Sequence, residues 1–454
     1  MKLKRGRLAD FTRPPSNPNA SVGARLLYAR LRNFYGTPAG TECPMAIGVN
    51  ETAAAAPYFA VNGNRLQALT GKQALLMAPF WIPRGATGYA EQVARVKEHH
   101  RAGGMCGTIW HPDNLLTGLN NYDRDRDSYA AVTACLSPGG SKLAEYRANL
   151  DGFAASLNED CVDDSGVPIP MLVRTAGEAN GWYDYPDMAI DSLTRSGTTA
   201  TLHFNRGANP LANAWGNGAR FQLRGVSNDT AWNRLWTVLN YTPDGDGNGA
   251  TVTFTVPNTL SSTTTGTRTC YPAAGAWWAG ADRAAELNEL VRQTITYLRD
   301  VKGCNQLLWS PNLFTWNRIY LSSNPATYPY SLWLDGMDDY YDFMSVNLYQ
   351  DEPVNWGFCD FGAQAVIDGF QPFVDWCNAR NRPIVMYEFG ARYDGATTAD
   401  FWGRRCFDAF DRTNFKRLAA VVFWSPTWMP TDGTPAVPDF QQALNKSRYR
   451  WLGQ

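Results

Sequence analysis

Short apolar runs alternate with segments of helical periodicity from residue 45 onward. Eight runs, most of them rich in β-branched or aromatic residues, are predicted to be strands, at residues 45–50, 74–80, 107–111, 169–175, 306–310, 344–349, 384–388 and 419–424. Amphipathic helices are predicted at residues 91–102, 142–158, 282–300, 362–379 and 398–414. This alternation predicts an α/β fold, a parallel (β/α)8 TIM barrel. A doubly wound dinucleotide-binding sheet is disfavoured because its glycine fingerprint is missing from the sequence.

Residues 191–272 interrupt this pattern after the fourth predicted strand. The stretch is rich in Thr, Gly and Asn, and strand-like alternation recurs at residues 198–204, 219–225, 235–241 and 250–256. Asp244-Gly-Asp-Gly-Asn-Gly predicts a hairpin turn in preference to a calcium loop, since the glutamate at the twelfth position of an EF-hand is missing. We expect an N-terminal arm (residues 1–40), a barrel in two parts (residues 41–190 and 273–454) and an inserted small all-β domain.

The composition limits the partners that the chain can have. With 454 residues, 44% of them hydrophobic and 18% charged, it can bury a large core and carry an extra domain. A net charge of −1 gives no basic field for nucleic acid, so we expect a neutral partner. The N-terminus has a basic start but no apolar h-region, which argues against an ordinary secretory signal, and no uncharged apolar stretch of about 18 residues occurs, which argues against a membrane span. Nine cysteines without a Cys-x-x-Cys motif and only four histidines predict no catalytic metal and no other cofactor.

Two predicted strands lead directly into a glutamate flanked by small residues. The fourth strand runs into Thr-Ala-Gly-Glu178-Ala-Asn-Gly, and the seventh ends in Glu388-Phe-Gly. A single glutamate at a strand end commonly does no more than face water. Two of them at the carboxyl ends of barrel strands face the same mouth, and a pair of carboxylates is what glycoside hydrolysis requires. An aromatic content of 13%, with 17 tryptophans, suits stacking on sugar rings.

Four motifs resemble glycoside hydrolase family 26, the retaining β-mannanases and related β-glycanases of the clan A barrels. They are Thr-Ile-Trp-His-Pro-Asp-Asn114 after the third strand, Gly-Val-Pro-Ile-Pro-Met-Leu-Val-Arg174 leading to Glu178-Ala-Asn-Gly-Trp-Tyr, the Trp277-Trp278 pair, and Tyr387-Glu388-Phe-Gly. The resemblance implies a retaining endo-β-glycosidase that acts by double displacement on an extracellular polysaccharide. In it Glu178 is the acid/base and Glu388 the nucleophile.

The resemblance also implies which residues surround the two glutamates. Tyr349 at the end of the sixth strand corresponds to the tyrosine that hydrogen-bonds the nucleophile. His111 corresponds to the histidine near the sugar that precedes the cleaved bond. Trp424 corresponds to the tryptophan on which the glycone sugar stacks. Asn114, Trp182 and Trp278 are further candidates for binding substrate. Arg174 is expected to donate to Glu388, although a purely structural salt bridge explains an arginine there equally well.

Gly177 departs from the family, which usually has histidine before the acid/base. The loss of this donor leaves mannan specificity open, and a modified or branched bacterial exopolysaccharide or capsule is an alternative substrate. A polysaccharide-binding protein with little or no catalysis is a second hypothesis. A third is another clan A activity, such as a β-glucanase or an exo-glycosidase.

Segments of residues 191–272 resemble small β units of bacteriophage virion proteins. Together with the missing secretory signal, this favours a phage-borne depolymerase on a tail appendage, with a non-standard secretion route or a cytoplasmic location as alternatives. The expected partner is a polysaccharide, with other virion proteins or self-association possible in addition, and neither nucleic acid nor membrane. The N-terminal arm is expected to pack on the barrel or to attach to a larger assembly.

Overall fold

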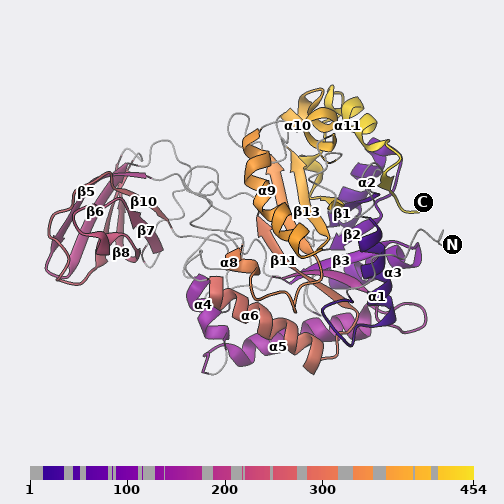
Figure 1. Ribbon diagram of the computed structural model, residues 1–454, viewed down its shortest axis with the longest axis horizontal. Helices are drawn as coiled ribbons and strands as arrows, with labels where there is room; N and C mark the ends of the chain where they lie inside the picture. Colours follow the sequence, from indigo (N-terminus) through magenta and orange to yellow (C-terminus); the bar gives the residue numbers. More distant parts are fainter. Residues whose placement is uncertain are drawn as a thin grey trace. The chain divides into compact units, whose positions relative to one another are not determined.

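The computed structural model describes residues 14–34, 44–51, 58–79, 84, 88–110, 115, 128–136, 139–175, 188–205, 217, 220–245, 249–272, 284–314, 331–350, 364–391, 394–408, 410 and 418–453. The chain divides into two compact units (Figure 1). The first comprises residues 1–111, 144–179 and 287–454, and the second comprises residues 112–143 and 180–286. Each unit is described by itself.

The first unit is built on a closed barrel of parallel strands. In chain order these are β1 Met45–Glu51, β2 Leu76–Pro79, β3 Met105–Trp110, β4 Met171–Thr175, β11 Leu307–Phe314, β12 Met344–Gln350, β13 Ile384–Ala391 and β14 Leu418–Phe423. Each strand pairs with the next, β14 pairs with β1 to close the ring, and β15 (Tyr449–Arg450) also pairs with β1. Every predicted barrel strand overlaps an observed one, which confirms the (β/α)8 barrel.

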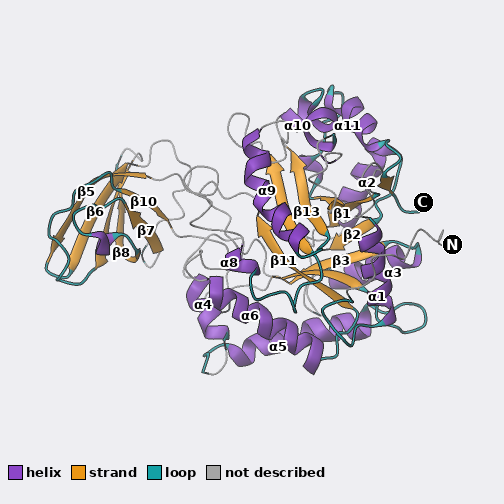
Figure 2. Ribbon diagram, in the orientation of Figure 1, coloured by secondary structure: helices purple, strands orange, loops and turns teal. Residues whose placement is uncertain are grey.

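Helices surround these strands in the first unit (Figure 2). The α-helices of the described chain are α1 Val22–Asn33, α2 Tyr58–Thr70, α3 Tyr89–Arg101, α4 Ser128–Cys135, α5 Leu143–Ala155, α6 Ala284–Thr296, α8 Ser331–Leu334, α9 Gln364–Ala379, α10 Asp394–Thr397 and α11 Ala436–Leu444. Single π-helical turns, Ser156–Asp160 and Tyr297–Val301, extend α5 and α6, and short 3-10 turns lie at Thr230–Trp232 and Pro426–Trp428. Because helices cover the outer face of a parallel sheet, its strands are apolar on both faces.

The helix predicted at residues 398–414 is a π-helix, Phe401–Phe407, in the part of it that the structure describes. Asp400 precedes it with a left-handed φ of 69°, so an α-helix does not extend back through this residue. Trp402 and Phe407, which are joined by the i to i+5 spacing of a π-turn, both pack on the ring of Phe389, at centroid distances of 6.0 and 6.1 Å. The π-helical turn, which is wider than an α-helical turn, thus places the Trp402 and Phe407 rings on the same side of the helix, where both contact Phe389.

Helix α1 covers the N-terminal end of the barrel. It starts at the N-cap Ser21, whose hydroxyl accepts the backbone N–H of Ala24 at 3.1 Å. Its buried face, including Leu27 and Leu31, belongs to one apolar cluster. This cluster also contains residues from the first three positions of the barrel strands, namely Ala46, Leu76, Met105, Leu172, Leu308, Val385 and Ala420. Of the two alternatives for the N-terminal arm, its described part therefore packs on the barrel.

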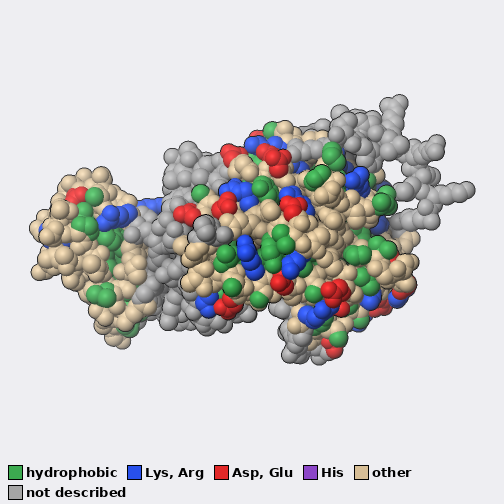
Figure 3. All heavy atoms as spheres, turned by 90° about the horizontal axis from the view of Figure 1, so that it is seen from below, with side chains coloured by type: hydrophobic (Ala, Val, Ile, Leu, Met, Phe, Trp, Pro, Cys, Tyr) green, Lys and Arg blue, Asp and Glu red, His purple; other side chains and the backbone are tan. Residues whose placement is uncertain are grey.

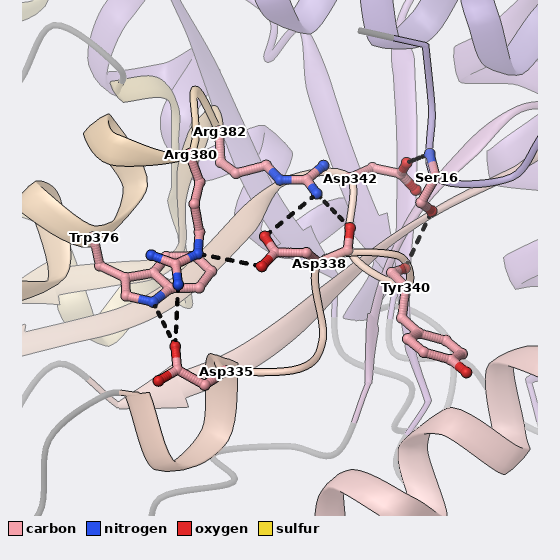
Figure 4. A network of polar contacts seen from close by, with 8 residues as sticks. All are labelled: Ser16, Asp335, Asp338, Tyr340, Asp342, Trp376, Arg380 and Arg382. Atoms are coloured by element: carbon pink, nitrogen blue, oxygen red, sulfur yellow. Dashed lines mark hydrogen bonds and ion pairs between the residues drawn. The ribbon is translucent and has the colours of Figure 1, made fainter.

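A buried carboxylate anchors the chain ahead of α1 (Figure 4). Asp342, which is fully buried, accepts the backbone N–H of Ser16 at 2.5 Å and that of Trp309 at 2.8 Å. Burial raises the pKa of Asp342. Beside it, Arg382 donates to the backbone carbonyl of Asp338 at 2.5 Å, so one polar network joins the N-terminal segment to the entrance of β12 and β13.

Charges of both signs are interspersed on the surface. The face drawn in Figure 3 carries Lys and Arg side chains next to Asp and Glu side chains, in keeping with the net charge of −1. Arg101 pairs with Asp164 at 2.6 Å, and Arg84 pairs with Asp160 at 2.7 Å. Within the described ranges, no helix has the length and apolar character needed to cross a membrane.

The second unit contains a closed antiparallel barrel, here called the β module. Its strands are β5 Met188–Ser196, β6 Thr199–Asn205, β7 Arg220–Arg224, β8 Leu235–Pro243, β9 Gly249–Thr255 and β10 Thr269–Pro272, in the spatial order β10-β5-β6-β9-β8-β7. The four strands predicted from alternation correspond to β6, β7, β8 and β9. Strand β5 was not predicted, because a bulge between Ile190 and Ser192 breaks the alternation of its apolar and polar residues. The strand begins at Met188, before the predicted domain boundary at residue 191.

Aromatic rings fill the β module, and a tight hairpin joins two of its strands. Phe254 packs against Phe221 and Trp236, with ring centroids 4.9 and 5.3 Å apart. Between β8 and β9, the backbone N–H of Asp244 donates to the carbonyl of Gly249 at 3.0 Å, which confirms the predicted turn.

His203 on β6 lies between two carboxylates of the β module. Its Nε2 is 3.0 Å from Asp244 and its Nδ1 is 2.9 Å from Asp191. The hydrogen bond with Asp244 raises the pKa of His203 most, desolvation opposes it, and Asp191 raises it further. Because the pKa in the folded state is above that in the unfolded state, the protonated ring stabilises the module fully below the unfolded pKa. This stabilisation is lost as pH rises through the folded pKa.

We expect His203→Gln to lower the melting temperature of the β module most near pH 5, below the ordinary histidine pKa, and least near pH 9, well above it. The effect is small, under about 1 kcal/mol for each ion pair, since the groups are partly exposed to solvent. Thermal unfolding across this pH range measures it. An equal difference at every pH would contradict the charge-based account.

Candidate active site

A β-bulge in β13 sets the direction of Glu388. Pairing with β12 runs from Met386 directly to Glu388, so that Tyr387 is an extra residue in β13. Pairing with β14 is irregular over the same residues. Successive residues of a regular strand point to opposite faces, whereas a bulge re-aims a side chain. Here Tyr387 and Glu388 both contact one side chain, that of Arg174.

Arg174 and Tyr349 hold the two oxygens of the Glu388 carboxylate. Arg174 Nη1 on β4 donates to Oε1 of Glu388, and the Tyr349 hydroxyl on β12 donates to Oε2. Glu388 is 5% exposed and Arg174 is fully buried. A buried carboxylate is costly unless a cation and hydrogen-bond donors accompany it, and these two residues supply both.

Aromatic rings support this pair of donors. The guanidinium carbon of Arg174 lies 4.3 Å from the centre of the Tyr387 ring, within cation–π range. The Tyr387 hydroxyl donates to the carbonyl of Leu172 at 3.1 Å. Its ring needs the glycine at position 107, since a Cβ there would lie 1.7 Å from the hydroxyl oxygen. The ring of Tyr349 in turn packs on Trp428, with centroids 4.7 Å apart.

Two asparagines that the sequence did not identify complete the described site. Asn50 at the end of β1 receives a hydrogen bond from Arg174 Nη2 at 3.4 Å and donates to the carbonyl of Tyr387 at 2.5 Å. Asn62 on α2 donates to the carbonyl of Asn50, and to that of Trp424 at 3.0 Å. A polar residue at a strand's carboxyl end was the available signal for Asn50. Asn62 lies on helix α2, and no sequence signal pointed to it.

Strands β11 and β12 carry buried uncharged polar residues. Asn347 on β12 pairs in register with Glu388, and Asn312 on β11 pairs with Ser345. All three uncharged residues are fully buried. Among the described residues, the Asn312 side-chain amide has no hydrogen-bond partner. No cluster of three or more His, Cys, Asp or Glu suited to a metal ion occurs in the described part of the chain.

The structure therefore brings together Arg174, Tyr349 and Glu388 from the predicted set. Trp424 lies directly after β14, is partly exposed, and donates its backbone N–H to Phe389 at 3.1 Å. The other predicted residues lie outside the described part of the chain, namely His111, Asn114, Glu178, Trp182 and Trp278, as does Gly177. Their roles and the separation of Glu178 from Glu388 stay predictions.

Three solved structures illustrate what this barrel is similar to. A modular endo-β-1,4-mannanase from Cellulomonas fimi aligns with a TM-score of 0.61 at 17% identity, over 97% of this chain and 78% of that one. The catalytic domain of a glycoside hydrolase family 26 endo-β-1,4-mannanase from Bacillus sp. JAMB-750 gives 0.61 at 17% identity, over 97% and 94%. A family 26 β-mannanase from Bacteroides ovatus gives 0.59 at 15% identity, over 97% and 96%. The chain has the fold of these mannanases.

No protein-family model matches the chain, and no curated protein matches it. The likeness to the solved structures consequently concerns the fold, and the chemistry has to be argued from the residues themselves. A carboxylate at the carboxyl end of a barrel strand, held on both oxygens by fixed donors, can serve as a nucleophile or as a general base. Its two donors keep it in one orientation, which either role requires.

Proposed function

We propose that the chain is a retaining glycoside hydrolase that cleaves a β-linked polysaccharide. The observation that supports this proposal is the Glu388 carboxylate in the carboxyl-terminal half of β13, which accepts hydrogen bonds from Arg174 and Tyr349. In this barrel the site occupies the end of the strands where TIM-barrel enzymes carry out their chemistry. The fold shared with family 26 mannanases supports the same reaction class.

In the proposed mechanism, Glu388 attacks the anomeric carbon while Glu178 gives its proton to the departing glycosidic oxygen. The bond from sugar to leaving group breaks, and a glycosyl ester forms on Glu388. Glu178 then takes a proton from water, which attacks the same carbon, releases Glu388 and restores the original anomeric configuration. Only one oxygen of Glu388 forms the ester, so the donor on the other oxygen can stay in place throughout.

The proposed substrate is a neutral polysaccharide, mannan-like or a bacterial exopolysaccharide or capsule. The net charge of −1 provides no attraction for a polyanion. Trp424, partly exposed after β14, is the proposed stacking platform for a sugar ring. Gly177 in place of the family histidine removes a donor beside the acid/base, and sugar selectivity depends on such donors.

A polysaccharide panel tests this function. It contains β-1,4-mannan, galactomannan, mixed-linkage β-glucan, β-1,3-glucan and several bacterial capsules, with release of reducing ends as the readout. We expect cleavage of at least one of them, and proton NMR of the first product should show the β-anomer. An α-anomer formed first would contradict retention. Binding without any release of reducing ends would favour the alternative of a polysaccharide-binding protein.

A further inference from the structure

The bulge that turns Glu388 inward is held by a side chain from another strand. The bulge residue Tyr387 has no register partner on β12, and its carbonyl accepts a hydrogen bond from Asn50 Nδ2 at 2.5 Å. Asn50 lies on β1, which is separated from β13 by β14 in the ring of strands. The backbone immediately before Glu388 is therefore held by a residue of β1, a strand that does not pair with β13.

The same amide also contacts the arginine that binds the carboxylate. Asn50 Oδ1 accepts from Arg174 Nη2 at 3.4 Å, a long hydrogen bond. A backbone carbonyl can only accept and a guanidinium can only donate, so a group between them has to offer one donor and one acceptor. A short neutral amide does this. An aspartate would place a negative oxygen against the carbonyl of Tyr387, and a leucine would satisfy neither neighbour.

Asn50 is itself fixed in place. Its side chain is fully buried, and its backbone carbonyl accepts a hydrogen bond from Asn62, which is 2% exposed. Asn62 also donates to the carbonyl of Trp424 at 3.0 Å, so one amide ties the ends of β1 and β14 together. The two asparagines thus form a short buried chain of hydrogen bonds that links α2 to the backbone beside Glu388.

We propose that Asn50 is a positioning residue for the nucleophile. It holds the bulge backbone with its donor and the Arg174 guanidinium with its acceptor, and thereby sets the place from which Glu388 reacts. This inference rests on the proposed function, because a nucleophile has to lie about 3–3.5 Å from the carbon it attacks. Asn62 supports Asn50 from behind.

Asn50→Leu tests the proposal, since leucine is similar in size and lacks both polar groups. With β-1,4-mannan, or the panel polysaccharide that the wild-type enzyme cleaves fastest, we expect kcat to fall about 100-fold and KM to change less than about threefold. The matched control is Asn17→Leu. Asn17 is 1% exposed and its amide bonds Asn305 at 2.9 Å beside the N-terminal segment, so this variant also loses a buried amide but should keep its kcat.

A crystal structure of Asn50→Leu gives a second readout that is independent of activity. We expect the Glu388 carboxylate to leave hydrogen-bond distance of Arg174 or Tyr349. A kcat above half of the wild-type value overturns the positioning role while the proposed function stands, and so does a carboxylate still bonded to both donors. If wild-type enzyme cleaves nothing in the panel, the proposed function fails, and the crystal structure then decides only whether Asn50 holds the Glu388 carboxylate in place. Should Asn50→Leu not fold, Asn50→Ser serves for both measurements.

Discussion

Glu388→Gln is expected to lower kcat/KM by about 10⁴ to 10⁶-fold, the range seen when an enzyme loses its nucleophile. The amide has the shape of the carboxylate. Its oxygen can accept from Arg174 and its NH2 group can donate to the Tyr349 hydroxyl, so the fold should persist. The amide lacks the charged oxygen that forms the glycosyl ester in the proposed mechanism. Initial rates of reducing-end release on the substrate found in the panel measure the loss, and unchanged circular dichroism verifies the fold.

Two further variants sharpen this test. Glu98→Gln removes a carboxylate from the surface of α3, where the Glu98 side chain is 68% exposed, and should leave kcat/KM unchanged. Glu388→Ala leaves space beside the anomeric carbon, and added azide should restore turnover of a substrate with a reactive leaving group, giving the inverted glycosyl azide. Wild-type activity in Glu388→Gln would remove Glu388 from the mechanism.

Arg174→Met is expected to lower the free energy of unfolding by about 3–5 kcal/mol, because it leaves the buried Glu388 carboxylate without its cation. Loss of a fixed donor at the reacting carboxylate should also lower kcat by about 10² to 10³-fold. Methionine keeps the apolar contact with the Tyr387 ring, so the change is chiefly electrostatic. Urea unfolding measures the first effect, and initial rates measure the second.

The double variant Arg174→Met/Glu388→Gln separates charge from packing. It removes both charges, so its free energy of unfolding should recover much of what Arg174→Met loses. Arg174→Lys keeps the charge but cannot present the planar fork, and should fall between wild type and Arg174→Met in kcat. If the single and double variants were equally unstable, the loss would come from packing and the account of a compensated buried charge would fail.

The barrel could be predicted from the sequence because of how its strands are buried. Each parallel strand is covered by helices outside and side chains inside, so it appears as a continuous apolar run, and the runs recur at helix-sized intervals. The β module was predicted in part, since β5 carries a bulge and β10 has only four residues. Neither shows the alternation on which strand prediction depends.

The site was predictable as far as it follows from strand ends. Arg174, Tyr349 and Glu388 lie at or near the carboxyl ends of predicted strands, and the closed barrel brings them together. The bulge at Tyr387 was not predictable, because an extra residue in one strand becomes visible only when its neighbours' register is known. Asn50 and Asn62 bond residues that lie 337 and 362 positions away in the chain, and no local sequence pattern records such contacts.

The β module begins and ends on neighbouring strands. Met188, the first residue of β5, pairs with Cys270 of β10, so the chain enters and leaves this barrel at adjacent points. A chain segment whose ends already meet needs little further loss of entropy to bring them together. Residues 188–272 can therefore form their barrel while the chain enters and leaves it at one place, on the neighbouring strands β5 and β10.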